Sequence, residues 1–403
     1  MVFLVLVEKL FLGLLFIIPL VGLYSGLSLA ATVPLFFFLC LFYVRKLLEF
    51  RVMDHKLEMI LILWIIASSF WSISFVNSFF SAIKFITEFL IGLLVIRNIA
   101  KVNIAESKIE NTIMLSLLAS IVIFAIEYLT NGSVSLLFRE LVQKKESHIF
   151  FLHNLDRGIA LLTLLSWVVI GVFLKRASRV SALLVYFTLL PVLIFSDNLA
   201  ALVAHVIGGL VFVVTRLTIL KNPKILCFLF LVCSVLMIIF AFKVNALEVA
   251  QTNDSLPLSA KHRLFIWNFV AENSQDHPIL GIGFNASRQF PVEEEQIIKL
   301  FGINLNPLPL HPHNNIMQVY FELGFIGLIF YLSLACKYLL IIGKNYRTTN
   351  VVSKDLMCAL YACFSVYFII AMISYSVWQS WWVSTALFIA TLCSMLIVPK
   401  VNS

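Results

Sequence analysis

The chain has little charge for its length. Charged residues make up 12% of its 403 residues, whereas hydrophobic residues make up 61%. A soluble globular domain is usually about one quarter charged and about half apolar. This deficit excludes an ordinary soluble domain and favours a protein that lies mostly in a membrane.

Other features are also missing. No internal repeat or low-complexity linker divides the chain. The apolar stretch at residues 1–23 has no obvious cleavage site, so we interpret it as a first membrane helix and not as a removable signal peptide. No cysteine lies in a predicted external loop, and no cysteine spacing is typical of a zinc site, so we expect neither a structural disulfide nor zinc. The seven cysteines are Cys40, Cys227, Cys233, Cys336, Cys358, Cys363 and Cys393.

Long apolar stretches recur along the whole chain. A stretch of about 18 or more apolar residues can cross a bilayer as a helix. We therefore predict an all-α, polytopic membrane protein with about twelve transmembrane helices. The predicted spans are 4–23, 27–44, 57–74, 78–99, 111–131, 157–174, 180–195, 199–216, 225–246, 316–342, 355–376 and 381–398. Residues 1–246 hold nine spans, 247–312 a loop and 313–403 three more spans, in one integrated membrane domain.

The basic residues predict the orientation. The net charge is +8, and lysine and arginine follow the even-numbered predicted spans, whereas the short loops on the other side carry none. Lysine and arginine concentrate in cytoplasmic loops. Both termini are therefore predicted to be cytoplasmic, and the positive charge is a topology signal and not a sign of nucleic-acid binding.

This orientation places two longer segments outside, 132–156 and 247–312. In the larger one, we expect a short helix over 261–273, a second short helix over 292–300 and an extended stretch over 304–312, which contains three prolines. The segment is thus predicted to form a small helical cap over the membrane domain.

Polar side chains gather at the predicted external face. Arginine offers planar, fixed-charge donors that suit phosphate oxygens, and histidine is the common general base near neutral pH. Such a cluster at a membrane surface suits a lipid-linked phosphate donor and a hydroxyl nucleophile. The residues are Arg157, Asp197, Asn198, Arg263, Arg288 and His313.

His313 is the strongest candidate base. Pro312 precedes it and two asparagines follow, so we expect His313 to open the tenth span. The positive end of a helix dipole disfavours an imidazolium and so keeps the ring neutral. His311 lies in the extended segment and is expected to support His313, and Asn314 is a further candidate for substrate binding.

Each candidate also has a structural interpretation. His313 could only cap a helix or anchor at lipid headgroups, and together with His311 it could bind a metal, although no third ligand has a supporting pattern. Arg263 could be an interfacial residue that contacts headgroups. Arg157 could form an ion pair with Asp156.

Residues within the spans and at their ends also have structural interpretations. Lys84 and Glu88 lie four apart on one helix face, so they could form an internal ion pair or line a polar path. The tryptophans at 378, 381 and 382 are typical of an aromatic belt at the membrane interface. Gly324 and Gly327 favour close helix packing.

The residues from His313 onward resemble a known family. His313-Asn314, nine residues, Gly324, two residues and Gly327 are similar to the His-Asn-x9-Gly-x-x-Gly signature of the O-antigen ligase family, within a broader group that includes O-antigen polymerases. The turn Trp71-Ser72-Ile73-Ser74 is also like this group. So is the stretch from Arg263 to Trp267, followed by His277-Pro278 and by Gly281-Ile282-Gly283.

The resemblance implies a metal-independent, inverting glycosyltransferase of the GT-C type that needs no cofactor. It would move polysaccharide from undecaprenyl diphosphate to a hydroxyl of lipid A–core at the periplasmic face of a bacterial inner membrane. His313 matches the family's proposed base, and Arg263 matches an arginine thought to hold the diphosphate. One position departs from the pattern, because Asn198 stands where the family commonly has arginine. Arg157 or Lys84 would then supply the charge, or the donor is held differently.

Three other functions remain open. A polymerase that extends lipid-linked repeats and a ligase that glycosylates protein would share the resemblance. A transporter of polysaccharide or lipid would usually show inverted repeats and broken helices at the bilayer midplane. The polar cluster of this chain lies at one face, which favours the enzyme.

Overall fold

The computed structural model describes residues 2–44, 48–143, 152–348 and 352–397, and these residues are almost entirely helical. The first half of the chain contains α1 (Val2–Tyr24), η1 (Gly26–Ser28), α2 (Leu29–Val44), η3 (Val52–His55), α3 (Lys56–Ser69), α4 (Phe75–Asn98), η4 (Ile99–Lys101), α5 (Glu106–Leu129), α6 (Ser133–Gln143), η5 (Leu152–Leu155), α7 (Asp156–Lys175), α8 (Arg179–Phe195) and α9 (Leu199–Leu217).

The second half contains η6 (Ile219–Lys221), α10 (Pro223–Lys243), α11 (Ala246–Thr252), α12 (Leu258–Asn273), η7 (Ser287–Gln289), η8 (Glu294–Gln296), β1 (Ile298–Leu300), β2 (Ile303–Leu305), α13 (Asn315–Thr348), α14 (Lys354–Ile373) and α15 (Ser380–Ile397). Within the described ranges, ten helices are long and apolar enough to cross a membrane. The other two predicted spans are shorter helices, α3 with 14 residues and α8 with 17. The prediction of a polytopic, all-α membrane protein is confirmed.

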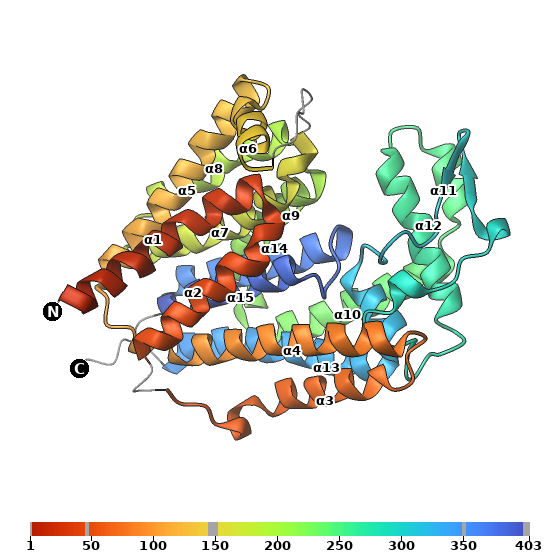
Figure 1. Ribbon diagram of the computed structural model, residues 1–403, viewed down its shortest axis with the longest axis horizontal. Coiled ribbons are helices and arrows are strands. Elements are labelled where there is room, and N and C mark those ends of the chain that lie inside the picture. Colours follow the sequence, from red (N-terminus) through yellow and green to blue (C-terminus); the bar gives the residue numbers. More distant parts are fainter. Residues whose placement is uncertain (1, 45–47, 144–151, 349–351, 398–403) are drawn as a thin grey trace.

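Helix α7 lies among α1, α5, α8, α14 and α15, in one part of the helical bundle (Figure 1). The apolar window of α7 is 89% buried, whereas that of α10 is 17% buried, so α7 lies at the centre of this part and α10 at the periphery. α7 packs against α1, α8, α14 and α15, and α14 also packs against α9 and α13. The segment with α11, α12 and the β1–β2 hairpin projects at one end, and the chain termini lie at the opposite end (Figure 1).

The projecting segment, residues 246–312, which we call the cap, is only partly as predicted. The helix expected over 261–273 is present as α12, but the second helix expected over 292–300 is wrong. A capping box between Glu293 and Gln296 starts a single 3-10 turn there. Phe301 and Gly302 both have positive φ and form a tight turn, so Ile298 pairs with Leu305 in an antiparallel hairpin.

The most informative local feature is a break in α13. Gly324 has φ 66° and ψ −171°, which interrupts the helix. This region of backbone space is essentially open only to glycine. Residues 278–283 of the cap run alongside the break, and a Cβ on Gly324 would lie 2.1 Å from the Ile279 carbonyl oxygen.

The backbone groups freed by the break all find partners. The carbonyl oxygens of residues 321, 322 and 323 accept from Ile282 N at 3.0 Å, Gly283 N at 2.9 Å and Trp64 Nε1 at 3.0 Å. The amides of residues 325 and 326 donate to the carbonyl oxygens of residues 278 and 279. Buried backbone groups need such partners, so the break and the cap loop stabilise each other.

We expect Gly324→Ala to destabilise the protein by about 3 kcal/mol or more, because a side chain there meets both a forbidden φ and backbone atoms. Thermal unfolding of the purified protein in detergent would measure the loss. Gly13→Ala is the matched control, since a Cβ on Gly13 meets nothing within 4 Å. Equal stability of the two variants would contradict this account of the break.

Candidate functional site

His313 lies just before α13, not within it. Its φ is +53°, and the helix begins two residues later, so His313 lies at the start of the tenth span, as expected. The cap of the helix is Asn314, whose Oδ1 accepts from Ile316 N at 3.0 Å and Met317 N at 3.1 Å. The Asn314 side chain is fully buried, and its Nδ2 has no hydrogen-bond partner among the described residues.

The ring of His313 is fixed through one nitrogen. Its Nδ1 lies 2.7 Å from the carbonyl oxygen of Ser374, in the segment between α14 and α15. A carbonyl oxygen only accepts, so Nδ1 carries the hydrogen and Nε2 carries the lone pair. No described residue hydrogen-bonds Nε2, which leaves it available as a general base.

His311 supports this arrangement. Its Nδ1 accepts from His313 N at 3.1 Å, and the two ring centroids are 4.2 Å apart. Burial, together with the charges of His313, Arg288 and Arg263, lowers the pKa of His311 to about 3, so the ring is neutral. Nδ1 of each histidine is already engaged, and the described residues hold no group of three histidine, cysteine or carboxylate side chains that could hold a metal ion.

Arg263 on α12 lies next to His313 without a counter-ion. Its Nη1 donates weakly to Ser259 O at 3.3 Å, and its Nε is buried without a hydrogen-bond partner. Burial lowers the pKa of this guanidinium, and Tyr375 opposes the shift. Among the described residues, no carboxylate pairs with it, so its remaining donors are free for an anion.

The charge of Arg263 affects the pKa of His313. Burial lowers the pKa of His313, the Ser374 hydrogen bond raises it, and the charges of Arg263 and His262 lower it. The net shift is downward and keeps the imidazole neutral near pH 7.

Arg157, at the first turn of α7, forms no ion pair with Asp156 in the structure. Its guanidinium lies over the ring of Trp381, 5.8 Å from the centroid, a cation–π contact. Asn198 caps α9, with Oδ1 accepting from Ala201 N at 3.0 Å, and its Nδ2 donates to Asp156 O at 3.1 Å. Asn198 and Arg157 are therefore neighbours, although they come from different helices.

Tyr375 links these groups, and the sequence analysis missed it. Its hydroxyl donates to Asp156 O at 3.2 Å, and its ring meets Trp381 edge-on at 4.6 Å. Burial raises its pKa, while the charges of Arg157 and Arg263 both lower it. The charges of both arginines therefore act on Tyr375. It has almost no sequence signal, because it falls within the predicted span 355–376.

Lys84 is not brought into this cluster. Its side chain is exposed on α4, and no ion pair with Glu88 is found among the described residues, so the ion-pair interpretation is wrong. The Glu88 carboxylate instead accepts from the Ser384 hydroxyl on α15.

Arg288 is exposed, as expected for a loop residue, but its charge acts on His311.

The predicted aromatic belt does not form, because Trp378, between α14 and α15, and Trp381 and Trp382, in the first turn of α15, are all buried. Trp378, Trp381 and Trp382 are at most 7% exposed. Trp378 Nε1 donates to the buried Glu322 carboxylate at 2.5 Å. These rings therefore support the site from within and do not anchor the protein at the headgroups.

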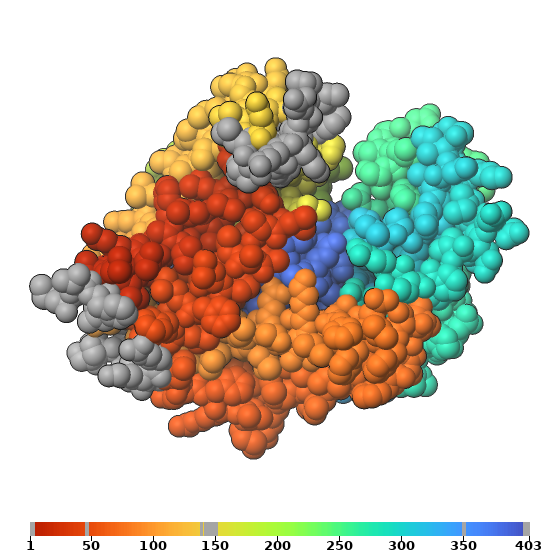
Figure 2. All heavy atoms as spheres, viewed as in Figure 1, coloured from red at the N-terminus to blue at the C-terminus, as the bar shows by residue number. Residues whose placement is uncertain are grey.

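The surface is hollowed beside these residues. Figure 2 shows a hollow between the cap, in green to cyan, and the yellow helices around α5 and α6, with the blue C-terminal segment at its floor. This hollow provides room for a substrate next to the α14–α15 segment.

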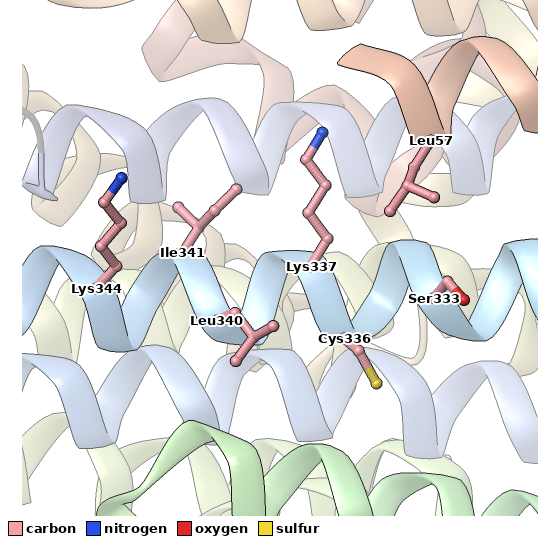
Figure 3. A pocket seen from close by; sticks show the side chains of 7 residues that line it. All are labelled: Leu57, Ser333, Cys336, Lys337, Leu340, Ile341 and Lys344. Atoms are coloured by element: carbon pink, nitrogen blue, oxygen red, sulfur yellow. The ribbon is translucent and has the colours of Figure 1, made fainter. Parts of the chain in front are cut away.

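A second groove, of about 440 Å³, lies far from His313 on the other half of α13 (Figure 3). Lys337 in this groove is already paired with Glu58 at 2.6 Å. Its lining is mostly apolar, and Lys337 is about 30 Å along the helix from Asn315 at 1.5 Å per residue. It is therefore separate from the candidate site. The lining residues are Leu57, Ser333, Cys336, Lys337, Leu340, Ile341 and Lys344.

Comparison with known proteins gives a consistent result. Residues 184–332 match a family model described as O-antigen ligase. Three relatives that bear the name "Putative polysaccharide ligase" come from Rickettsia felis, Rickettsia typhi and Rickettsia bellii, and they are 34%, 33% and 32% identical to this chain. The alignments cover 96%, 98% and 96% of this chain and 98%, 99% and 97% of the relatives. On this full-length similarity, the chain belongs to the O-antigen ligase family of polysaccharide ligases.

Proposed function

We propose that this protein transfers a polysaccharide from undecaprenyl diphosphate to a sugar hydroxyl of lipid A–core. The observation that carries the proposal is an oriented imidazole together with a half-buried guanidinium that has no counter-ion among the described residues. His313 offers an unprotonated Nε2, and Arg263 offers unpaired donors. Family membership supports the polysaccharide as the group transferred.

The proposed reaction balances without further reagents. Nε2 of His313 takes the proton of the acceptor hydroxyl while the oxygen of that hydroxyl attacks the anomeric carbon of the donor sugar. The bond from that carbon to the diphosphate oxygen breaks on the opposite side, so the configuration inverts. Undecaprenyl diphosphate leaves with its charge met by arginine, which reduces the need for a metal or a general acid.

Asn198 stands where the family commonly has an arginine, so another residue would have to supply the second positive charge at the diphosphate. Asn198 hydrogen-bonds the carbonyl of Asp156 at 3.1 Å, next to Arg157 in the chain. Arg157 therefore lies close to the position where the family commonly has arginine, whereas Lys84 does not meet the cluster. We propose that Arg157 supplies the missing charge and that Arg263 and Arg157, whose charges both act on Tyr375, bind the diphosphate together.

We further propose that the site faces the periplasm of a bacterial inner membrane. The basic loops are predicted to be cytoplasmic, and the cap lies at the end of the molecule opposite to the termini (Figure 1). A polyprenyl donor and a lipid-anchored acceptor would both reach the hollow from the membrane.

The rate of transfer should persist below pH 6.5. Because burial and Arg263 lower the pKa of His313, the neutral base survives to a lower pH than a free imidazole would, and the rate falls only as the pH drops through the lowered pKa. A pH–rate profile of kcat/KM with purified protein would measure this acid limb. A limb at or above pH 6.5 would contradict the proposed surroundings of His313.

Analysis of lipopolysaccharide in a strain that lacks this protein tests the function. Complete core without polymer supports a ligase. Core that carries a single repeat would indicate a polymerase, and unchanged lipopolysaccharide would contradict both. Accumulation of donor on the cytoplasmic side would indicate a transporter.

A further inference from the structure

The segment between α14 and α15, residues 374–379, is held by two buried side chains of α13. Oε1 of Gln318 accepts from Val377 N at 3.1 Å, and its Nε2 donates to Ser376 Oγ at 2.9 Å. Oε2 of Glu322 accepts from Trp378 Nε1 at 2.5 Å. Both side chains are fully buried.

Gln318 and Glu322 are also tied to each other and to the cap. Gln318 Nε2 donates to Glu322 Oε1 at 3.2 Å, one helical turn apart. Backbone amides of residues 285 and 287 and the Ser287 hydroxyl donate to the same carboxylate at 3.0, 3.2 and 2.5 Å. Glu322 therefore receives five hydrogen bonds and joins three parts of the chain: α13, the cap and the segment 374–379.

The same segment carries the acceptor that fixes His313. Ser374 O accepts from Nδ1 of His313 at 2.7 Å and lies two residues before Ser376. No described carboxylate contacts the ring, so this carbonyl has the orienting role that a carboxylate often has for a histidine base. If the segment moved, Nδ1 of His313 would lose its acceptor. The ring could then adopt the other tautomer, in which Nε2 carries the hydrogen and no longer offers a lone pair.

We propose that Gln318 and Glu322 are positioning residues, which fix the tautomer and orientation of His313 by holding the segment 374–379. Neither side chain reaches a substrate. The inference rests on the proposed role of His313 as base, but it also makes a claim about the resting protein that is independent of activity.

The first test reads the tautomer directly. In full-length protein labelled with ¹⁵N-histidine, the His313 resonances are assigned by their loss in His313→Asn. The expected result is an Nδ1–H tautomer that is lost or mixed in Gln318→Ala and Glu322→Gln. Glu127→Gln is the matched control, because Glu127 is equally buried and hydrogen-bonds Ser135. An unchanged tautomer in folded Gln318 and Glu322 variants would overturn the inference, even if transfer activity were confirmed.

The second test uses transfer kinetics. We expect Gln318→Ala to lower kcat by about 10- to 100-fold with little change in KM, because the full contribution of a general base is about 10²–10⁴-fold. In a His313→Asn background, the same substitution should cause no further loss, since both changes remove one function. A full additional loss in the double variant would show that Gln318 acts only through general stability. A native-like melting curve of Gln318→Ala excludes misfolding.

Discussion

His313→Ala is expected to lower the rate of polysaccharide transfer by about 10²–10⁴-fold, the usual contribution of a general base. The residual rate would come from binding and from charge stabilisation by arginine. KM for the donor should change little, because Nε2 faces the acceptor hydroxyl in the proposed reaction. Transfer from purified lipid-linked donor to lipid A–core, measured in vesicles, would give both constants.

The control must separate chemistry from folding. His313 has a positive φ, which asparagine tolerates better than most residues, and an asparagine amide can still donate to Ser374 O. His313→Asn should therefore fold and remain inactive. His277→Ala removes an exposed imidazole from the same cap and should keep full activity. Undiminished transfer by His313→Asn would refute the base assignment.

Arg263→Ala is expected to raise the KM for the diphosphate donor by about 10- to 100-fold, since a hydrogen bond to a charged group contributes about 1.5–3 kcal/mol. The guanidinium is half-buried and has no counter-ion in the structure, so the bound diphosphate would be its main partner. Arg263→Lys keeps the charge but loses the planar fork, and an intermediate KM is expected.

Lys299→Ala serves as the control for charge. Lys299 is an exposed cation in the β1–β2 hairpin of the same cap, so its loss changes the net charge equally without touching the site. Binding of a soluble undecaprenyl diphosphate analogue can be measured by titration calorimetry. Equal affinities of the Arg263 and Lys299 variants would disprove the proposed role of Arg263.

Much of the site was visible in the sequence because its residues carry chemistry that is rare in an apolar chain. His313 and Arg263 stand out as polar residues at predicted external positions, and the structure brings them together. Asn314 was predicted only as a substrate contact, because an asparagine before a helix suits both roles, and the hydrogen bonds to residues 316 and 317 show that it also caps the helix.

Other parts of the site had almost no sequence signal. Tyr375, Gln318 and Glu322 matter through contacts with residues that are 56 to 219 positions away. The tryptophans at 378, 381 and 382 have the spacing and location of an interfacial belt, yet they are buried. The sequence pattern of one segment shows how apolar that segment is. It does not show which of its faces another segment covers.

The sequence by itself determined that this chain is an all-helical membrane protein, because a run of apolar residues must satisfy its own backbone hydrogen bonds in lipid. The break in α13 at Gly324 was not predicted, because the sequence pattern indicated only close helix packing there and the backbone conformation is set by contact with the cap. Only the tertiary structure decided which nitrogen of His313 is free and which arginine stands beside Asn198. Those properties depend on contacts between helices far apart in the chain, and such contacts are formed only when the helices pack.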